Sequence, residues 1–224
     1  MPRGGEMTGK LPGDHRFSPA DDDPFESMHA KPNTGRAFVK VHLERADNHE
    51  IMTFNLPLDG RLDPDDAKVI AYFFRCRRTG RQRSINPGVL ALLADVAVQW
   101  PERTIEIISG FRAPPYGAPH SKHFRGLAID LRIRGVRTTA LRDYLWREHR
   151  GVGIGYYRKE NFVHMDSRPA AHERAWSGSE EGGPTRPNPR WARKARRVPP
   201  TPRITPESLV QPYAFAPTPG SRTF

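Results

Sequence analysis

The sequence contains little cysteine, few apolar residues and no long hydrophobic run. Its single cysteine, Cys76, excludes a disulfide framework and any zinc module built from clustered cysteines. No apolar segment approaches the roughly eighteen residues that a membrane-spanning helix requires, so we expect no transmembrane segment. The first 35 residues include three consecutive aspartates, Asp21 to Asp23, and lack an apolar stretch, so we also expect no signal peptide there.

Proline and glycine are concentrated toward both ends of the chain. Only 36% of the 224 residues are hydrophobic, which is below the ordinary globular share and indicates that part of the chain does not pack. Residues 1–34 hold five Pro and four Gly without apolar periodicity, and residues 177–224 hold ten Pro and eight Lys and Arg against three Glu. We therefore predict disordered segments at 1–34 and 177–224, the second a basic tail, and one compact α+β domain at 35–176.

Apolar periodicity within this domain indicates both strands and helices. Two helices are expected to start at Asp63-Pro64 and Asn86-Pro87, because each pair combines a capping side chain with a proline at the first helical position. A third helix is expected at 138–150. Alternation of apolar and polar residues predicts strands at 36–43, 103–111, 127–133, 152–157 and 161–166, the last two joined as a hairpin.

Two predicted strands each carry polar residues on a face opposite apolar ones. On strand 127–133 the odd-numbered residues are all Leu or Ile, whereas the even-numbered ones include Asp130. On strand 161–166, His164 and Asp166 share one face. If both strands lie in one sheet, Asp130 and His164 can converge. His123 precedes the first strand on a loop that can fold over the sheet, which completes a set of two histidines and one carboxylate. This is the ligand type of a catalytic zinc with an open position for water.

The same residues resemble a known family. The pattern Ser121-x-His123-x-x-Gly126-x-Ala128-x-Asp130, followed by His164, resembles the signature of the D-Ala-D-Ala metallopeptidases, which share a fold with the hedgehog signalling domain. Residues 109–112 and 162–166 look most like the branch that contains murein endopeptidase K, and the likeness covers roughly residues 38–176. The resemblance implies a small, mostly antiparallel sheet with helices packed on one face. It also implies a zinc-dependent hydrolase that acts on the peptide stems of peptidoglycan in the periplasm or cell envelope.

The resemblance also implies roles for individual residues. His123, Asp130 and His164 would bind Zn²⁺, Arg112 would stabilise the oxyanion formed on the attacked carbonyl, and Ser121 would help to hold the substrate. Many members of the wider family carry a Glu as general base three residues before the last histidine, where this chain has Asn161. The remaining candidates for the base are Asp166, Glu160 and His120. Asp166 ranks first because it shares a face with His164, although orienting His164 is an equally good role for it.

Other interpretations stay open at this point. The trio could be a loop histidine, a hydrogen-bonded strand aspartate and a core histidine, although the intact motif spacing disfavours this. Asn161 leaves room for a catalytically weak or inactive peptidoglycan-binding module on the same fold. The formal charge of +11 and the basic tail 177–224 fit a polyanion binder. We expect no specific nucleic-acid partner, because no recognised nucleic-acid motif is present. The sequence does not indicate an oligomeric state.

Overall fold

The structure of the protein is a computed structural model that describes residues 36–118, 120–178, 185–187 and 189–200. The predicted N-terminal segment 1–34 lies outside the described residues, as does the end of the predicted tail, 201–224. Within the described chain none of the helices combines the length and the apolar character that crossing a bilayer requires.

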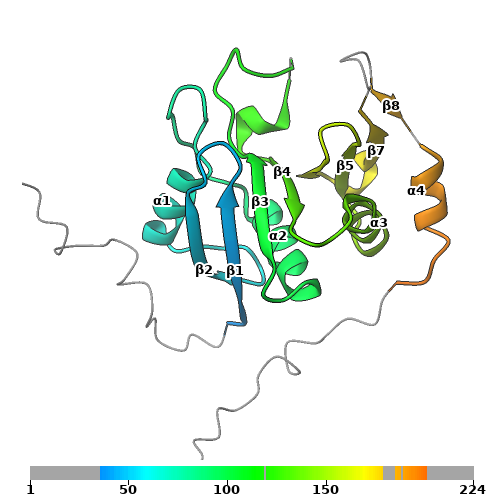
Figure 1. The fold of residues 1–224 in the computed structure, drawn as a ribbon, viewed down its shortest axis with the longest axis horizontal. Helices are drawn as coiled ribbons and strands as arrows, with labels where there is room; N and C mark the ends of the chain where they lie inside the picture. Colours follow the sequence, from blue (N-terminus) through cyan, green and yellow to red (C-terminus); the bar gives the residue numbers. More distant parts are fainter. Residues whose placement is uncertain (1–35, 119, 179–184, 188, 201–224) are drawn as a thin grey trace, which may run out of the picture. The chain divides into compact units, whose positions relative to one another are not determined.

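The described residues form one mixed sheet with helices, which confirms the α+β class (Figure 1). Sheet order is β2-β1-β3-β4-β6-β5-β7-β8, and every neighbouring pair is antiparallel except β1–β3 and β5–β7. The sheet is therefore mostly antiparallel as expected, but with eight strands it is larger than the small sheet predicted. The elements are β1 (Phe38–Arg45), β2 (Ile51–Pro57), α1 (Pro64–Phe73), α2 (Pro87–Gln99), β3 (Thr104–Ser109), η2 (Lys122–Arg125), β4 (Ala128–Ile133), α3 (Thr138–Glu148), β5 (Val152–Tyr157), β6 (Phe162–Ser167), η3 (Ala170–His172), β7 (Arg174–Ser177), β8 (Arg186–Pro187) and α4 (Arg190–Ala195).

Local sequence signals account for the helix starts. Asp63 accepts hydrogen bonds from the backbone amides of Asp65 and Asp66, and Asn86 accepts one from that of Gly88. In both helices a proline occupies the first turn, where no intrahelical amide donor is needed. The capping prediction is confirmed for α1 and α2. The third helix, α3, ends at Glu148, two residues earlier than expected.

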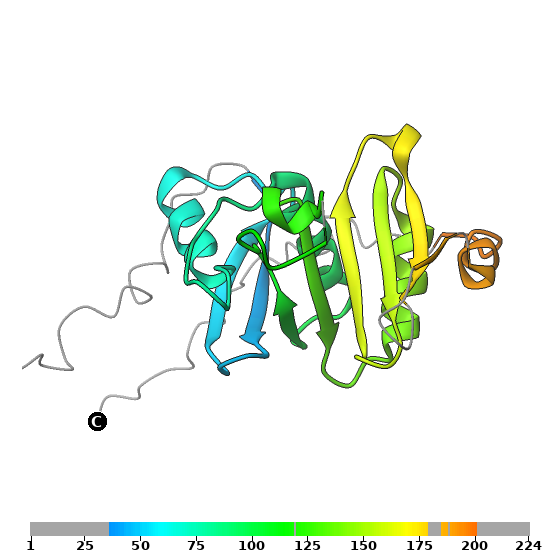
Figure 2. The ribbon, with the colours of Figure 1, turned by 90° about the horizontal axis from the view of Figure 1, so that it is seen from above.

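Helices α2 and α3 lie on the face of the sheet opposite the polar residues of interest. Helix α2 packs against β1, β2 and β6, and α3 packs against β4, β5 and β6. The side chains beneath them are fully buried and come from alternate strand positions: Leu43, Ile105, Ile129, Leu131, Val163 and Met165. Figure 2 shows β4, β6 and β5 running side by side. The other face of β4 and β6 is thus free to present polar groups.

Folded structure continues into the segment predicted to be a disordered tail. Helix α4 lies at the edge of the fold beyond β7 (Figures 1 and 2), where Ala192 and Ala195 are buried. The indole N–H of Trp146 donates to the carbonyl of Ala192 at 3.1 Å, and the guanidinium of Arg196 lies 4.3 Å from the Trp146 ring centre. Within the predicted tail, the described residues include folded backbone at 186–187 and 190–195. Trp191 adds to this packing, because its ring lies 6.4 Å from that of Trp146 and its Nε1 donates to Oγ of Ser177 at 3.1 Å. A proline-rich composition does not reveal these contacts.

Candidate metal centre

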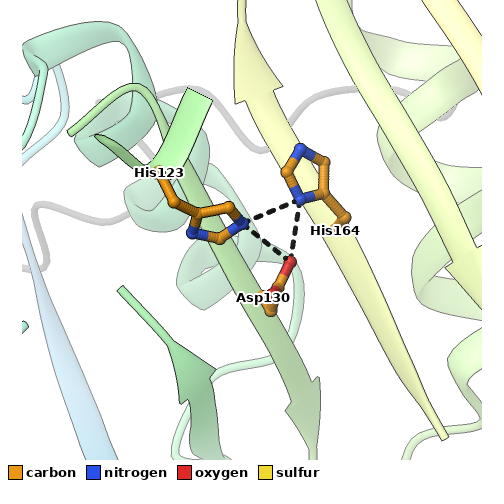
Figure 3. A group of neighbouring side chains, drawn as sticks. All are labelled: His123, Asp130 and His164. Atoms are coloured by element: carbon orange, nitrogen blue, oxygen red, sulfur yellow. Dashed lines mark hydrogen bonds and ion pairs between the residues drawn. The ribbon is translucent and has the colours of Figure 1, made fainter. Parts of the chain in front are cut away.

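Three side chains from three elements meet on the face of the sheet opposite α2 and α3 (Figure 3). His123 lies in η2, and Asp130 on β4 pairs directly with His164 on β6. Nε2 of His123 lies 3.1 Å from Nδ1 of His164 and 3.2 Å from Oδ1 of Asp130, and the last two atoms are 2.8 Å apart. All three side chains are buried. Strand register and the η2 turn thus bring one atom from each residue to a common point.

Hydrogen bonds on the outer side of each ring define which nitrogen faces that point. Nδ1 of His123 donates to the carbonyl oxygen of Gly110 at 2.7 Å, and Nε2 of His164 donates to Oδ2 of Asp166 at 3.0 Å. Because a carbonyl and a carboxylate can only accept, these nitrogens carry the protons. The inner nitrogens are left to act as ligands, which is the arrangement that metal-binding histidines adopt. Two imidazole nitrogens and one carboxylate oxygen are therefore a donor set that fits a divalent zinc ion.

The charges of the trio are strongly coupled. Burial would raise the pKa of Asp130, but His123 and His164 hold it well below its usual range, so the carboxylate is ionised at neutral pH. Burial lowers the pKa of His123, and the neighbouring Asp130 only partly opposes this. Burial also acts to lower the pKa of His164, but hydrogen bonds to Asp130 and Asp166 outweigh it and raise that pKa to about 9. A cation at the centre would therefore have to displace a proton from His164.

Asp166 lies behind His164, away from the point where the ligand atoms meet. Its carboxylate is fully buried, and Arg168 donates to both of its oxygens, with Nε 2.5 Å from Oδ1 and Nη2 2.6 Å from Oδ2. A Cβ on Gly153 would lie 2.3 Å from Oδ2 of Asp166, so the glycine on β5 makes room for this ion pair. Asp166 also lines the cavity of the trio, and its oxygens contact His164 and Arg168. Its ranking as first candidate for the base therefore stays a prediction, and its contact with His164 also suits the orienting role.

Arg112 contacts the carboxylate of the trio directly. One guanidinium nitrogen donates to Oδ2 of Asp130, and Nε donates to Oγ of Ser109 at 2.8 Å. A register shift in the pairing of β3 with β4 places Ser109 opposite Asp130, which is how this bond becomes possible. Arg112 remains about one-third exposed at the mouth of the site. It is therefore both a partner of Asp130 and a fixed positive charge facing solvent.

The other predicted residues differ in how close they come to the trio. Ser121 and His120 line the cavity of about 460 Å³ that contains the three side chains. Asn161 lies at the β5–β6 turn with φ +54°, and its Oδ1 accepts a hydrogen bond from Thr138 at 3.0 Å. Among the described residues that line the cavity of the trio, neither Asn161 nor Glu160 occurs.

Aromatic side chains form part of the cavity wall. The ring of Trp176 lies 5.1 Å from that of His164, and its Nε1 donates to Oη of Tyr157 at 3.2 Å. Tyr157 stacks on Phe162 with ring centres 4.5 Å apart. Gly155 stands between His164 and Trp176 in the sheet, and a Cβ there would lie 2.5 Å from the indole. No local pattern points to this wall, because it forms only when β5, β6 and β7 pair.

Arg168 was also missed, although the sequence holds a signal for it. Strand alternation places residues 162, 164 and 166 on one face, and 168 is the next position in that series. An arginine there is the natural partner for a buried carboxylate at position 166, since an unpaired buried charge is costly. Extending the alternation by one step would have identified the pair.

Comparison with known proteins agrees with the motif. A family model described as peptidoglycan L,D-endopeptidase MepK matches residues 34–176. The chain is 31% identical over 112 residues to peptidoglycan L,D-endopeptidase MepK of Escherichia coli K12, which covers 45% of this chain and 61% of the relative. It is 29% identical over 127 residues to the probable peptidoglycan L,D-endopeptidase MepK of Haemophilus influenzae, which covers 51% and 66%. The matched regions thus span less than two thirds of these curated relatives. Because the family model covers more than half of the chain, the protein belongs to the peptidoglycan L,D-endopeptidase MepK family.

Proposed function

We propose that the protein is a zinc-dependent peptidase that hydrolyses peptide bonds in the stems or cross-links of peptidoglycan. The observation that carries the proposal is the convergence of Nε2 of His123, Oδ1 of Asp130 and Nδ1 of His164. The outer hydrogen bonds to Gly110 and Asp166 support it, because they leave the inner nitrogens available as ligands. The relatives are named as L,D-endopeptidases, so we propose an internal bond of this stereochemistry in the wall as the substrate. Such a substrate would place the protein in the periplasm or cell envelope.

We propose the following roles for the side chains. His123, Asp130 and His164 would hold the zinc ion, which when bound would lower the pKa of a water molecule to about 7 and polarise a carbonyl. Arg112 supplies a fixed positive charge beside Asp130, where negative charge on a carbonyl oxygen can be stabilised. Ser121 lines the same cavity and would hold the peptide.

The proton acceptor is proposed from burial and from the residues that line the cavity. Asp166 and His120 both line the described cavity, whereas Glu160 does not. Asp166 is fully buried, and both of its oxygens accept hydrogen bonds from Arg168. His120 lines the cavity with an exposed side chain. We therefore assign proton acceptance to His120 and orientation of His164 to Asp166. Replacement of His120 with Ala should lower kcat by about 100-fold or more while zinc content stays unchanged.

Purified full-length protein provides the direct test. Wild-type protein should contain about one zinc ion per chain and should cleave cross-linked peptidoglycan, and a chelator should abolish cleavage. His123→Ala should lose both properties. His172→Ala is the matched control, because His172 is an exposed histidine in η3 outside the trio. Equal hydrolysis by the wild-type and His123→Ala proteins would overturn the assignment.

A second candidate function is a peptidoglycan-binding module without activity. It is motivated by Asn161, whose side chain accepts a hydrogen bond from Thr138. A binding module without activity would retain zinc and peptidoglycan fragments but release no product. The same digestion assay separates the two functions, because any zinc-dependent product excludes the inactive module.

A further inference from the structure

A second cavity adjoins the metal centre. It has a volume of about 400 Å³ and shares Arg112, Asp130 and Phe162 with the cavity of the trio. On the side away from the trio its wall is formed by the segment that follows α1, including Arg77 and Arg78. Because the two cavities share lining residues, one extended ligand can occupy both, with one part at the trio and another at the arginines.

The backbone that carries these arginines is a closed turn. The amide of Cys76 donates to the carbonyl of Arg81 at 2.9 Å, and the amide of Gly80 donates back to the carbonyl of Cys76 at 2.8 Å. Gly80 has φ +68°, a conformation that favours glycine. Arg77 and Arg78 lie between these bonds, at the tip of the turn.

Buried side chains attach the turn to the metal centre. Cys76 packs with Phe111 and Ala113, the two neighbours of Arg112 in the chain. The amide of Phe111 also donates to the carbonyl of Phe74 at 2.9 Å. The turn with Arg77 and Arg78 and the loop with Arg112 are therefore one packed unit, so the spacing between the arginines and the trio is set by the fold.

The charges of this cavity are unbalanced. Three of its arginines have acidic partners: Arg45 pairs with Asp47, Arg75 with Glu50 and Arg112 with Asp130. Within the described part of the chain, the side chains of Arg77 and Arg78 form neither a hydrogen bond nor an ion pair, and both residues are exposed. Burial would raise the pKa of Asp47, but Arg45 and, after it, the charge of Arg77 contribute to lowering that pKa. Asp47, an acid lining the same cavity, is already held by Arg45 at 2.8 Å. Two adjacent cations in a cavity beside the proposed reaction centre are suited to an anionic group on the ligand.

We propose that Arg77 and Arg78 bind a carboxylate of the peptide whose bond is placed at the trio. The inference rests on the proposed peptidase function and adds a site that determines which bond reaches the centre. A carboxylate fits because guanidinium groups donate paired hydrogen bonds to its two oxygens. The distance between the arginine turn and the trio then selects substrates whose carboxylate lies a set length of chain from the scissile bond.

The experiment compares peptide fragments of peptidoglycan with free carboxyl groups and the same fragments after amidation. Wild-type full-length protein should show a kcat/KM about 10- to 100-fold lower for the amidated fragments. The double variant Arg77→Gln/Arg78→Gln should show a similar loss with free fragments and little further loss on amidation, because the two changes remove the same interaction. Arg77→Lys/Arg78→Lys should recover part of the efficiency. Arg61→Gln, an exposed arginine outside both cavities, is the matched control and should behave as wild type.

Failure of this inference can be distinguished from failure of the peptidase proposal. If wild-type protein cleaves both forms of the fragment equally, the arginine site is wrong and the peptidase stands. If no cleavage occurs, calorimetric binding of free and amidated fragments to wild-type and Arg77→Gln/Arg78→Gln proteins still tests the site. Stronger binding of the free form that is lost in the variant supports it, and equal binding overturns it. Equal competition by inorganic phosphate at the same concentration would show a general anion site and overturn carboxylate selection.

Discussion

Oδ2 of Asp166 accepts a hydrogen bond from Nε2 of His164 at 3.0 Å, on the side of the ring opposite Asp130. This contact determines the orientation of His164 and leaves Nδ1 for the centre. Arg168 in turn forms an ion pair with Asp166. The proposed ligand His164 is therefore positioned by Asp166 and, through it, by Arg168. The trio is therefore a preorganised site whose supporting hydrogen bonds can be tested separately.

Asp166→Asn should weaken zinc binding by about 10- to 100-fold, because the neutral amide orients His164 less firmly and leaves Arg168 without its ionic partner. Competition with a chromogenic chelator measures the affinity. Asp143→Asn, which changes a partly exposed surface aspartate, should have no effect. If Asp166→Asn protein binds zinc normally and only kcat falls, the proton-acceptor role returns to Asp166.

Gly110→Ala should weaken zinc binding, although Gly110 is not itself a proposed ligand. A Cβ at residue 110 would lie 2.7 Å from the carbonyl oxygen of Phe74, and the carbonyl of Gly110 is the acceptor for His123. We expect a loss of roughly 1–3 kcal/mol in unfolding free energy from the overpacking, together with weaker zinc binding. Denaturant titration and chelator competition measure the two effects.

Gly80→Ala is the control for Gly110→Ala, because it also adds a methyl group to a glycine but does so away from His123. The added Cβ meets open space, but φ +68° strains an alanine by about 1–2 kcal/mol. It should therefore lower stability and leave zinc affinity unchanged. Equal zinc affinity in both variants would mean that Gly110 does not position His123.

The stability of the zinc-free protein should depend on pH through His164. Its pKa is raised to about 9 in the folded state from an ordinary value near 6.5, so its contribution is complete below pH ~6.5 and is lost as pH rises to about 9. The pKa of His123 is lowered, so His123 destabilises the folded protein only as pH drops below about 6.5. Cys76, whose pKa is lowered to about 7, acts in the opposite direction within the same window.

The measurement is therefore a difference between two proteins. Unfolding free energy of zinc-free wild type, minus that of His164→Gln, should decline by roughly 3 kcal/mol between pH 6.5 and 9. The contribution of Cys76 is present in both proteins and cancels in this difference. A flat difference across this range would show that His164 does not hold the extra proton.

Arg112→Lys should separate support of Asp130 from stabilisation of the reaction. Lysine keeps the charge but cannot donate in a fixed fork to both Ser109 and Asp130. We expect zinc affinity to change by less than tenfold and kcat to fall by about 100-fold. Arg132→Lys is the control, because Arg132 lies on β4 with Asp130 but pairs with Glu106. A large loss of zinc affinity with normal turnover per bound zinc would restrict Arg112 to holding Asp130.

The sequence by itself determined the features that arise from neighbouring residues. Asp63-Pro64 and Asn86-Pro87 start α1 and α2, because a cap needs only the amides two or three residues ahead. Alternation on β4 and β6 likewise assigned Asp130 and His164 to the faces opposite their apolar neighbours. The spacing of the motif from Ser121 to Asp130 then identified the family.

Tertiary structure decided everything that depends on which strands become neighbours. β4 pairs with β6, so Asp130 faces His164 across 34 residues of chain, and no local preference encodes that pairing. Contacts between residues far apart in the sequence also form the aromatic wall of Tyr157 and Trp176. The same holds for the packing of Cys76, which anchors the arginine turn. Backbone propensity acts over a few residues, whereas burial and ion pairing select among whole arrangements of the sheet, which is why only the folded chain defines the site.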